Sequence, residues 1–337
     1  MEKRLIAGFL SASLAIFVIH FFLDARRIYR SDLKKTNEKI EILRTKIDSL
    51  QNVNEEIKKE LEDISYLEIP ENLSFCNELV PLENPLIKRK LENFIFNATK
   101  FRANRWRMEI YLNEAQFYFP YFDEGLAQDS LPTDLKYIAV VESEFDNHAR
   151  SAAGAVGMWQ FIPGTAIKWG LTISYYVDDR KDPDEAFTAA RKELKELYGK
   201  FSSWFLAAAA YNAGARRVEE AIEENRKQRI LAAERGEVLD STYFGLLLPS
   251  ETMDYVYAIL TVKIIMENYK SYGFREPPYK VKDIEIVEYE IKNSNKKIAE
   301  AAADLGMSVS DFRFLNPRFT KKEIPPGFYK MKRLKRK

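Results

Sequence analysis

Cysteine and histidine are scarce in this sequence of 337 residues, which has one cysteine, Cys76, and two histidines. A single cysteine excludes a disulfide framework, and one cysteine with two histidines cannot form a zinc cluster. Basic residues number 52 and acidic residues 51, so the formal net charge is only +1. No charge excess therefore indicates a nucleic-acid partner. We expect no metal, no cofactor and no nucleic acid.

Strand patterns are also missing between Ile87 and Tyr272, where apolar and polar residues do not alternate. Helical patterns fill this region instead, as in "DEAFTAARKELKELYGKF" and "SETMDYVYAILTVKIIMENYK". Glycines and prolines in its middle, such as Gly154 and Pro163, mark loops. The hydrophobic content of 46% is enough for a real core. We predict a mainly α fold class, with an all-helical domain over residues 87–275.

The N-terminal residues contain an apolar run without charge from Leu5 to Leu23, about as long as a helix that crosses a bilayer core. No small-x-small cleavage site comes after it, so we predict an uncleaved anchor over residues 1–30, with a cleaved signal peptide as the alternative. By the positive-inside rule, the flanking charges favour a cytoplasmic location for the residues after the run. Basic residues after the run outnumber those before it: Arg26, Arg27 and Arg30 against Lys3 and Arg4.

A heptad pattern over residues 31–67 predicts a coiled-coil stalk and a homodimer formed through it. Asn54 at an a position is a known device for fixing register and strand number. The stalk would span roughly 50 Å at about 1.5 Å per residue. A lone amphipathic helix packed on the next domain is the alternative. The a positions are Leu33, Ile40, Ile47, Asn54 and Leu61, and the d positions are Thr36, Leu43, Leu50, Ile57 and Ile64.

Two further segments flank the helical domain. Residues 68–86 contain Pro70, Pro81 and Pro85 and are interpreted as a linker. Residues 283–337 begin with an alternating strand pattern, "IEIVEYEIK", and continue with two short helical segments and the strand-like "PPGFYKMKRL". This order predicts a separate small β-α-α-β module with a basic tail.

Glu142 occupies an unusual position for a carboxylate. A helix from Leu135 to Ser143 would place it on the apolar stripe with Leu135 and Ile138, which faces the core. Glutamate is almost never buried without a partner or a purpose. The helix pattern alone favours a cap or a salt bridge at a helix end, and catalysis is the alternative.

Four motifs in a fixed order decide between these interpretations. They are Glu142-Ser143, "GMWQ" from Gly157 to Gln160, "AYNAG" from Ala210 to Gly214, and "ETMDY" from Glu251 to Tyr255. Together they resemble the SLT domain of lytic transglycosylases in the lysozyme superfamily, and they are most similar to the membrane-bound lytic murein transglycosylase D type. The resemblance covers about Leu82 to Phe274 and implies a lysozyme-like all-helical fold. Met158 departs from it, because leucine is usual there.

The resemblance also implies a reaction and a set of roles. Such enzymes cut the β-1,4 bond between N-acetylmuramic acid (MurNAc) and N-acetylglucosamine (GlcNAc) in peptidoglycan without water and leave a 1,6-anhydro end. Glu142 would be first acid and then base, with a pKa raised by apolar surroundings. For the tyrosines of the motifs, core packing is the alternative. The implied substrate-binding residues are Ser143, Ser151, Gly157, Gln160, Tyr211, Asn212 and Tyr255.

Other polar and aromatic residues near the motifs receive more ordinary interpretations. We expect Asp146 and His148 in loops, and a local ion-pair and turn arrangement in "VDDR" (residues 177–180). Trp159 and Phe161 could stack on sugars or belong to the core. Gly157 is expected to let substrate approach the backbone, since glycine has no side chain.

The C-terminal module resembles a degenerate lysin-motif (LysM) domain, which binds GlcNAc-containing glycans, but "KNSNKK" replaces the usual Gly-Asp-Thr turn. A packing module without a ligand is the alternative. The expected partners are peptidoglycan strands and the cytoplasmic membrane. The expected location is the bacterial cell envelope, anchored in the inner membrane with the catalytic domain in the periplasm, in conflict with the flanking charges. A lysozyme-like hydrolase and a non-catalytic glycan-binding scaffold remain alternative functions.

Overall fold

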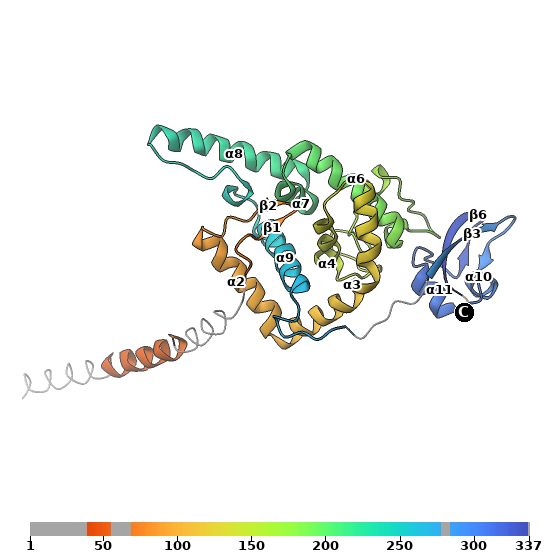
Figure 1. Cartoon of the computed structure of the whole chain (residues 1–337), viewed down its shortest axis with the longest axis horizontal. Helices are drawn as coiled ribbons and strands as arrows, with labels where there is room; N and C mark the ends of the chain where they lie inside the picture. Colours follow the sequence, from red (N-terminus) through yellow and green to blue (C-terminus); the bar gives the residue numbers. More distant parts are fainter. Residues whose placement is uncertain (1–38, 55–68, 278–283, 336–337) are drawn as a thin grey trace, which may run out of the picture. The chain divides into compact units, whose positions relative to one another are not determined.

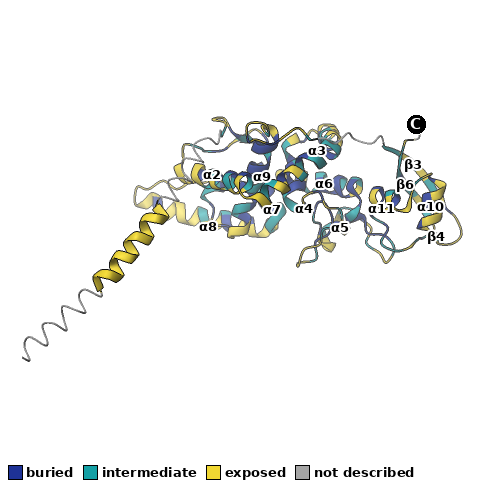
Figure 2. Ribbon diagram, turned by 90° about the horizontal axis from the view of Figure 1, so that it is seen from below, coloured by how far each residue is buried: buried dark blue, intermediate teal, exposed yellow. Residues whose placement is uncertain are grey.

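The computed structural model describes residues 39–54, 69–277 and 284–335. The chain consists of two compact units, Met1–Tyr66 and Leu67–Lys337. In the first unit, residues 39–54 form a helix that is exposed along its length (Figure 2). This helix lies within the predicted stalk, and both the coiled coil over residues 31–67 and its pairing with a second chain stay predictions. The proposed anchor lies outside the described residues. Among the residues that are described, no helix is both long and apolar enough to cross a bilayer.

The second unit is mainly helical, as predicted, and carries short strands at both ends (Figure 1). Its α-helices are α2 (Pro85–Lys100), α3 (Arg102–Gln128), α4 (Tyr137–Ser143), α5 (Pro163–Lys168), α6 (Pro183–Phe201), α7 (Trp204–Ala213), α8 (Ala215–Glu234), α9 (Ser250–Glu267), α10 (Ile298–Asp304) and α11 (Val309–Leu315). The 3-10 helices are η1 (Thr133–Lys136), η2 (Asp179–Lys181) and η3 (Tyr243–Gly245), and the strands are β1 (Ser74–Phe75), β2 (Glu78–Leu79), β3 (Ile284–Ile291), β4 (Lys296–Lys297), β5 (Glu323–Ile324) and β6 (Gly327–Leu334).

Side-chain caps and prolines fix where several helices begin. Asn84 caps α2 by accepting from the Leu86 N–H, and Pro85 takes its first position. Asp182 caps α6 in the same way and is followed by Pro183. Proline suits the first helical turn because its missing N–H would have no intrahelical partner there.

The core of the helical domain is built around α7 and α9. The alanines 207–210 of α7 are buried and small, so neighbouring helices can approach closely. Helix α9 is apolar nearly all round, which is typical of a helix surrounded by others. Helix α4 packs against α9 (Figure 1), so the motif that starts at Glu142 is placed beside the motif that starts at Glu251.

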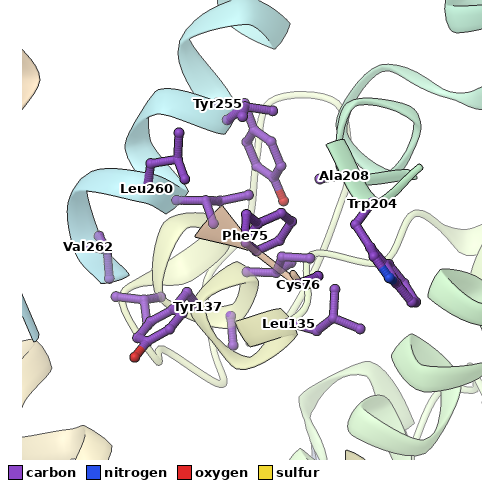
Figure 3. Close-up of a cluster of buried hydrophobic side chains, with 14 of the residues drawn as sticks. Phe75, Cys76, Leu135, Tyr137, Trp204, Ala208, Tyr255, Leu260 and Val262 are labelled. Carbon is purple, nitrogen blue, oxygen red and sulfur yellow. The ribbon is translucent and has the colours of Figure 1, made fainter. Parts of the chain in front are cut away.

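The predicted linker over residues 68–86 is wrong in its middle part. Leu73, Phe75 and Val80 are buried, and β1 and β2 form a small antiparallel hairpin. Figure 3 shows Phe75 in the same apolar cluster as Leu135 and as Tyr255 and Leu260 of α9. Prolines suggested a linker, but the apolar residues between them supply core contacts.

A largely buried ion pair fastens this hairpin to the helices. Asp134 Oδ2 accepts from the Cys76 N–H at 2.7 Å, and Asp134 Oδ1 accepts from Lys263 Nζ at 2.9 Å. The hairpin, η1 and α9 are therefore joined through one carboxylate, directly before the helix that carries Glu142.

The C-terminal module has its own small core. Strands β3 and β6 pair antiparallel from Ile284↔Leu334 to Ile291↔Gly327, and α10 and α11 lie between them in sequence. The β-α-α-β prediction is confirmed, with the short pair β4–β5 in addition. Its core cluster contains Ile298, Phe312 and Met331, and also Val177 from the helical domain.

Candidate active site

A cavity of about 560 Å³ brings the sequence motifs together. Five of the eight predicted site residues line it: Glu142, Ser151, Gln160, Tyr211 and Asn212. Ser143, Gly157 and Tyr255 are not among its lining residues. The remaining lining residues are Ala152, Ala153, Ala155, Phe161, Ile162, Thr165, Glu193, Ala210, Ala213, Gly214 and Glu251.

Glu142 sits in the last turn of α4, which ends where Glu144 adopts a left-handed conformation with φ of 60°. Its carboxylate Oε1 accepts a hydrogen bond of 2.6 Å from the Tyr255 hydroxyl. The pKa of Glu142 is raised from 4.5 to about 7, chiefly by burial; the Tyr255 hydrogen bond lowers it, and the negative charge of Glu251 contributes to the rise. A substantial fraction of Glu142 is therefore protonated at neutral pH and can donate a proton into the cavity.

Removal of the Tyr255 hydroxyl should raise the pKa of Glu142 further, because its hydrogen bond stabilises the ionised carboxylate. In Tyr255→Phe, the Glu142 carboxyl group should therefore stay protonated to higher pH. Titration of the Glu142 carboxyl carbon by NMR in both proteins measures this. A midpoint that moves to lower pH would contradict the assigned role of Tyr255.

Ser143 and Gly157 hold the cavity wall in place instead of lining it. The Ser143 hydroxyl donates to the Met158 carbonyl at 2.8 Å and is buried. Gly157 has φ of +85°, and a Cβ built there would lie 1.7 Å from the Arg180 carbonyl oxygen. The space that a side chain at position 157 would need is thus filled by the protein's own chain at Arg180, and an approach of substrate to the Gly157 backbone stays a prediction.

Tyr211 and Gln160 fix the loop of residues 157–161. The Tyr211 hydroxyl donates to the Trp159 carbonyl at 2.7 Å, and the Gln160 side-chain amide donates to the Gly157 carbonyl at 2.8 Å. Burial raises the pKa of Tyr211 far above its usual value, so the phenol remains a donor. Trp159 is fully buried and stacks on Phe187, which makes it a core residue. Phe161 lines the cavity, although only 3% of its surface is exposed.

Residues 120–233 match the family model described as "Transglycosylase SLT domain". We refer to the helical domain that contains these residues as the SLT domain. The chain is 32% identical over 236 residues to "Membrane-bound lytic murein transglycosylase D" of Escherichia coli strain K12. This match covers 69% of this chain and 48% of the relative. The chain thus spans about half the length of this curated relative.

Further comparisons give shorter or weaker matches. "Peptidoglycan transglycosylase gp16" of Escherichia phage T7 is 43% identical over 86 residues, which covers 25% of this chain and 6% of that protein. The solved structure of lytic transglycosylase Slt from Pseudomonas aeruginosa has 24% identity and a TM-score of 0.36, covering 45% of this chain and 24% of that chain.

Sequence reasoning missed two carboxylates at the cavity of the SLT domain. Glu251, in the first turn of α9, belongs to the "ETMDY" motif but was assigned no role. Glu193 in α6 accepts a hydrogen bond from the Trp169 indole N–H, and Lys168 lies 3.7 Å away. Among the described residues that line the cavity, the charged ones are all glutamates and none is basic. Carboxylate oxygens accept hydrogen bonds, so the cavity suits a ligand rich in hydroxyl and amide donors. No sequence pattern singles out Glu193, which looks like an ordinary helix-surface residue.

The loop predictions outside the motifs are confirmed in the SLT domain. Asp146 Oδ1 accepts from the His148 N–H at 2.7 Å in the turn after α4. Arg180 and Asp178 form the expected local ion pair, with contacts of 2.8 and 2.9 Å. Within the described residues, no cluster of His, Cys, Asp and Glu could hold a metal ion.

Proposed function

We propose that the chain is a peptidoglycan lytic transglycosylase that cleaves the MurNAc-β-1,4-GlcNAc bond without water and leaves 1,6-anhydro-MurNAc ends. The observation that carries this proposal is Glu142, a carboxyl group with a pKa of about 7 on the wall of a cavity of about 560 Å³. The sugar bond needs an acid that is protonated near neutral pH, and burial supplies one. The match of residues 120–233 to the SLT domain supports the same reaction.

In this mechanism one residue serves both halves of the reaction. Protonated Glu142 donates to the oxygen of the leaving GlcNAc as the glycosidic bond breaks. The carboxylate that forms then takes the proton of the muramoyl 6-hydroxyl, whose oxygen bonds to the anomeric carbon. Tyr255 steadies the ionised form by its hydrogen bond. Ser151, Gln160 and Asn212 on the cavity wall supply hydrogen-bonding groups for the sugars.

Mass spectrometry of the products tests this proposal directly. Digestion of purified peptidoglycan should give muropeptides that lack one water relative to hydrolysed ones, because the 6-hydroxyl replaces water as the nucleophile. Products with a free reducing end would show that the enzyme is a hydrolase instead.

A lysozyme-like hydrolase is the second candidate, because Glu251 lines the same cavity and its charge acts on Glu142. Two carboxylates are what a hydrolytic glycosidase uses. Glu251→Gln separates the two. In the lytic mechanism turnover persists. The alkaline limb of the pH–rate profile for glycan cleavage moves to lower pH, because loss of the neighbouring charge lowers the pKa of Glu142. In a hydrolase that needs Glu251 as base, turnover falls by about 10²-fold or more.

A non-catalytic glycan-binding scaffold is the third candidate, and the release of soluble muropeptides decides it. A scaffold has no turnover to lose, so wild-type protein would release none, and Glu142→Gln would change nothing.

The remaining proposals concern the location in the cell. We place the chain in the bacterial cell envelope, with residues 1–30 as an inner-membrane anchor and residues 31–67 as a dimeric stalk outside the membrane. The name of the Escherichia coli relative, a membrane-bound enzyme, supports an envelope location. A periplasm-dependent reporter fused after Leu67 should be active, and a silent fusion would reverse the topology. The isolated stalk peptide should dimerise at micromolar concentration.

The C-terminal module is proposed to be LysM-like and to bind glycan. Its β-α-α-β order supports this, and the departure at "KNSNKK" spans the turn after β3 and strand β4. Pull-down of the chain with insoluble peptidoglycan, with and without residues 283–337, measures the contribution of the module to binding.

A further inference from the structure

The C-terminal module is joined to the SLT domain through the loop of residues 173–182, which we name the bridging loop. Val177 and Phe319 form an antiparallel bridge, and the Asp178 N–H donates to the Arg318 carbonyl at 2.9 Å. The Thr320 N–H donates to the Tyr176 carbonyl, also at 2.9 Å. Val177 belongs to the core cluster of the module itself. The bridging loop is therefore part of both structures.

Charge explains why the module is needed at this loop. Asp178, Asp179 and Asp182 are only 4–6% exposed. Arg180 neutralises Asp178 from within the loop. Asp179 has its ion pair with Arg318 of the module, which also lies 3.7 Å from the Asp182 carboxylate. A buried carboxylate that loses its cation is strongly destabilised, so the SLT domain depends on Arg318 here.

The C-terminal module also forms ion pairs with α6. Lys332 of β6 lies 2.8 Å from Asp184 in the first turn of α6, and Arg318 lies 3.8 Å from Glu185. Burial raises the pKa of both carboxyl groups. The module thus places two cations, Arg318 and Lys332, beside a cluster of acidic residues at the start of α6.

The bridging loop in turn supports the cavity wall. The Arg180 guanidinium donates to the carbonyls of Gly154 and Phe161, at 3.2 and 3.3 Å. Its backbone carbonyl fills the space that a side chain at position 157 would need. Six residues of the 151–161 segment line the cavity: Ser151, Ala152, Ala153, Ala155, Gln160 and Phe161. A continuous set of contacts therefore runs from Arg318 through residues 178–180 to that wall.

We infer that Arg318 is a positioning residue for the cavity of the SLT domain, acting through Asp179 and Arg180. The C-terminal module completes the site by supplying the cation that keeps the bridging loop, and with it the 151–161 wall, in place. This role is separate from any binding of glycan by the module.

Hydrogen exchange on the full-length protein tests the inference without substrate. The Val156 and Gly157 amides donate to the carbonyls of Phe161 and Ala149, so they report whether the wall is formed. In Arg318→Ala these amides should exchange about tenfold faster or more, while those of α9 keep their protection. Arg313→Ala removes an exposed arginine from the same module and should leave the exchange unchanged. Equal protection of residues 154–161 in wild type and Arg318→Ala would overturn the inference.

Two further variants separate positioning from general loss of folding. Arg318→Lys keeps the charge and should recover part of the protection. Asp179→Asn in the Arg318→Ala background removes the uncompensated carboxylate and should also recover part of it. If neither variant slows exchange relative to Arg318→Ala, the inference is wrong.

The kinetic arm rests on the proposed function. Arg318→Ala should lower kcat/KM on glycan by roughly tenfold or more, because small displacements of a binding wall are costly. Arg318→Lys should recover part of this loss. An unchanged kcat/KM in Arg318→Ala would contradict action through the wall. Absence of cleavage by wild type would refute the proposed function and leave the exchange result standing.

Discussion

Glu142→Gln is expected to reduce glycan cleavage by a factor of about 10² to 10⁴, the range that a general acid or base contributes. Glutamine is nearly the same size but can neither donate the proton nor take it back. Glycan binding should remain, because the wall residues Ser151, Gln160 and Asn212 are unchanged. Release of soluble muropeptides over time measures the rate, and sedimentation with insoluble peptidoglycan measures binding.

Stability gives this experiment an internal check. The folded-state pKa of Glu142 is raised above that of an exposed glutamate, so its ionisation disfavours folding as pH rises from about 4.5 through about 7. Glu142→Gln should therefore unfold at a higher temperature than wild type at pH 8 and at a similar temperature at pH 4. A lost activity that coincides with a lower melting temperature at pH 8 would mean that the variant is damaged.

Glu144→Gln is the matched control for the catalytic assignment. Glu144 is two residues further on, is exposed, and lies 3.7 Å from Arg107 at the surface. An exposed pair of this kind contributes little to stability. This variant should cleave glycan at nearly the wild-type rate. Wild-type activity in Glu142→Gln, or its loss in Glu144→Gln, would contradict the catalytic assignment.

Gly157→Ala should destabilise the SLT domain by about 2–5 kcal/mol, the combined cost of a left-handed alanine and of an overpacked contact. The new Cβ would lie 1.7 Å from the Arg180 carbonyl oxygen, and this neighbour is backbone that cannot rotate away. Either the "GMWQ" turn or the bridging loop must move. Glycan cleavage should fall as well, because Gln160 lies three residues further along the wall. Denaturant unfolding followed by circular dichroism measures the free energy.

Gly154→Ala isolates the backbone contribution. Gly154 has nearly the same φ, +83°, but a Cβ there would meet nothing within 4 Å. Its substitution should cost only about 1–2 kcal/mol, from the left-handed conformation alone. Similar losses at the two positions would show that the contact with Arg180 is not what requires glycine at position 157.

Much of the site was accessible from the sequence because its residues lie in short motifs with local structure. The apolar stripe of Leu135 and Ile138 predicts the helix that ends at Ser143, and the structure places Glu142 on it. The strand alternation of "IEIVEYEIK" likewise predicts β3. Both features depend on neighbours in sequence, which periodicity describes well.

The contacts that hold the motifs together were not accessible, because they join residues distant in sequence. Gly157 was interpreted as making room for substrate, and nothing near it in the sequence indicated the Arg180 backbone that packs against it. "VDDR" suggested a local ion pair, which Asp178 and Arg180 form, but the partner of Asp179 is Arg318 in another module. Charge patterns within one segment carry no information about such a distant cation.

The proposed mechanism depends most on the protonation state of Glu142, and a direct titration measures it. Carbon-13 NMR of glutamate side-chain carboxyl groups, with Glu142→Gln to assign the signal, gives its midpoint in the substrate-free protein. We predict a midpoint of about 7, moved up in Tyr255→Phe and down in Glu251→Gln. A midpoint near the ordinary 4.5, the same in all three proteins, would contradict the proposal that burial makes Glu142 the acid.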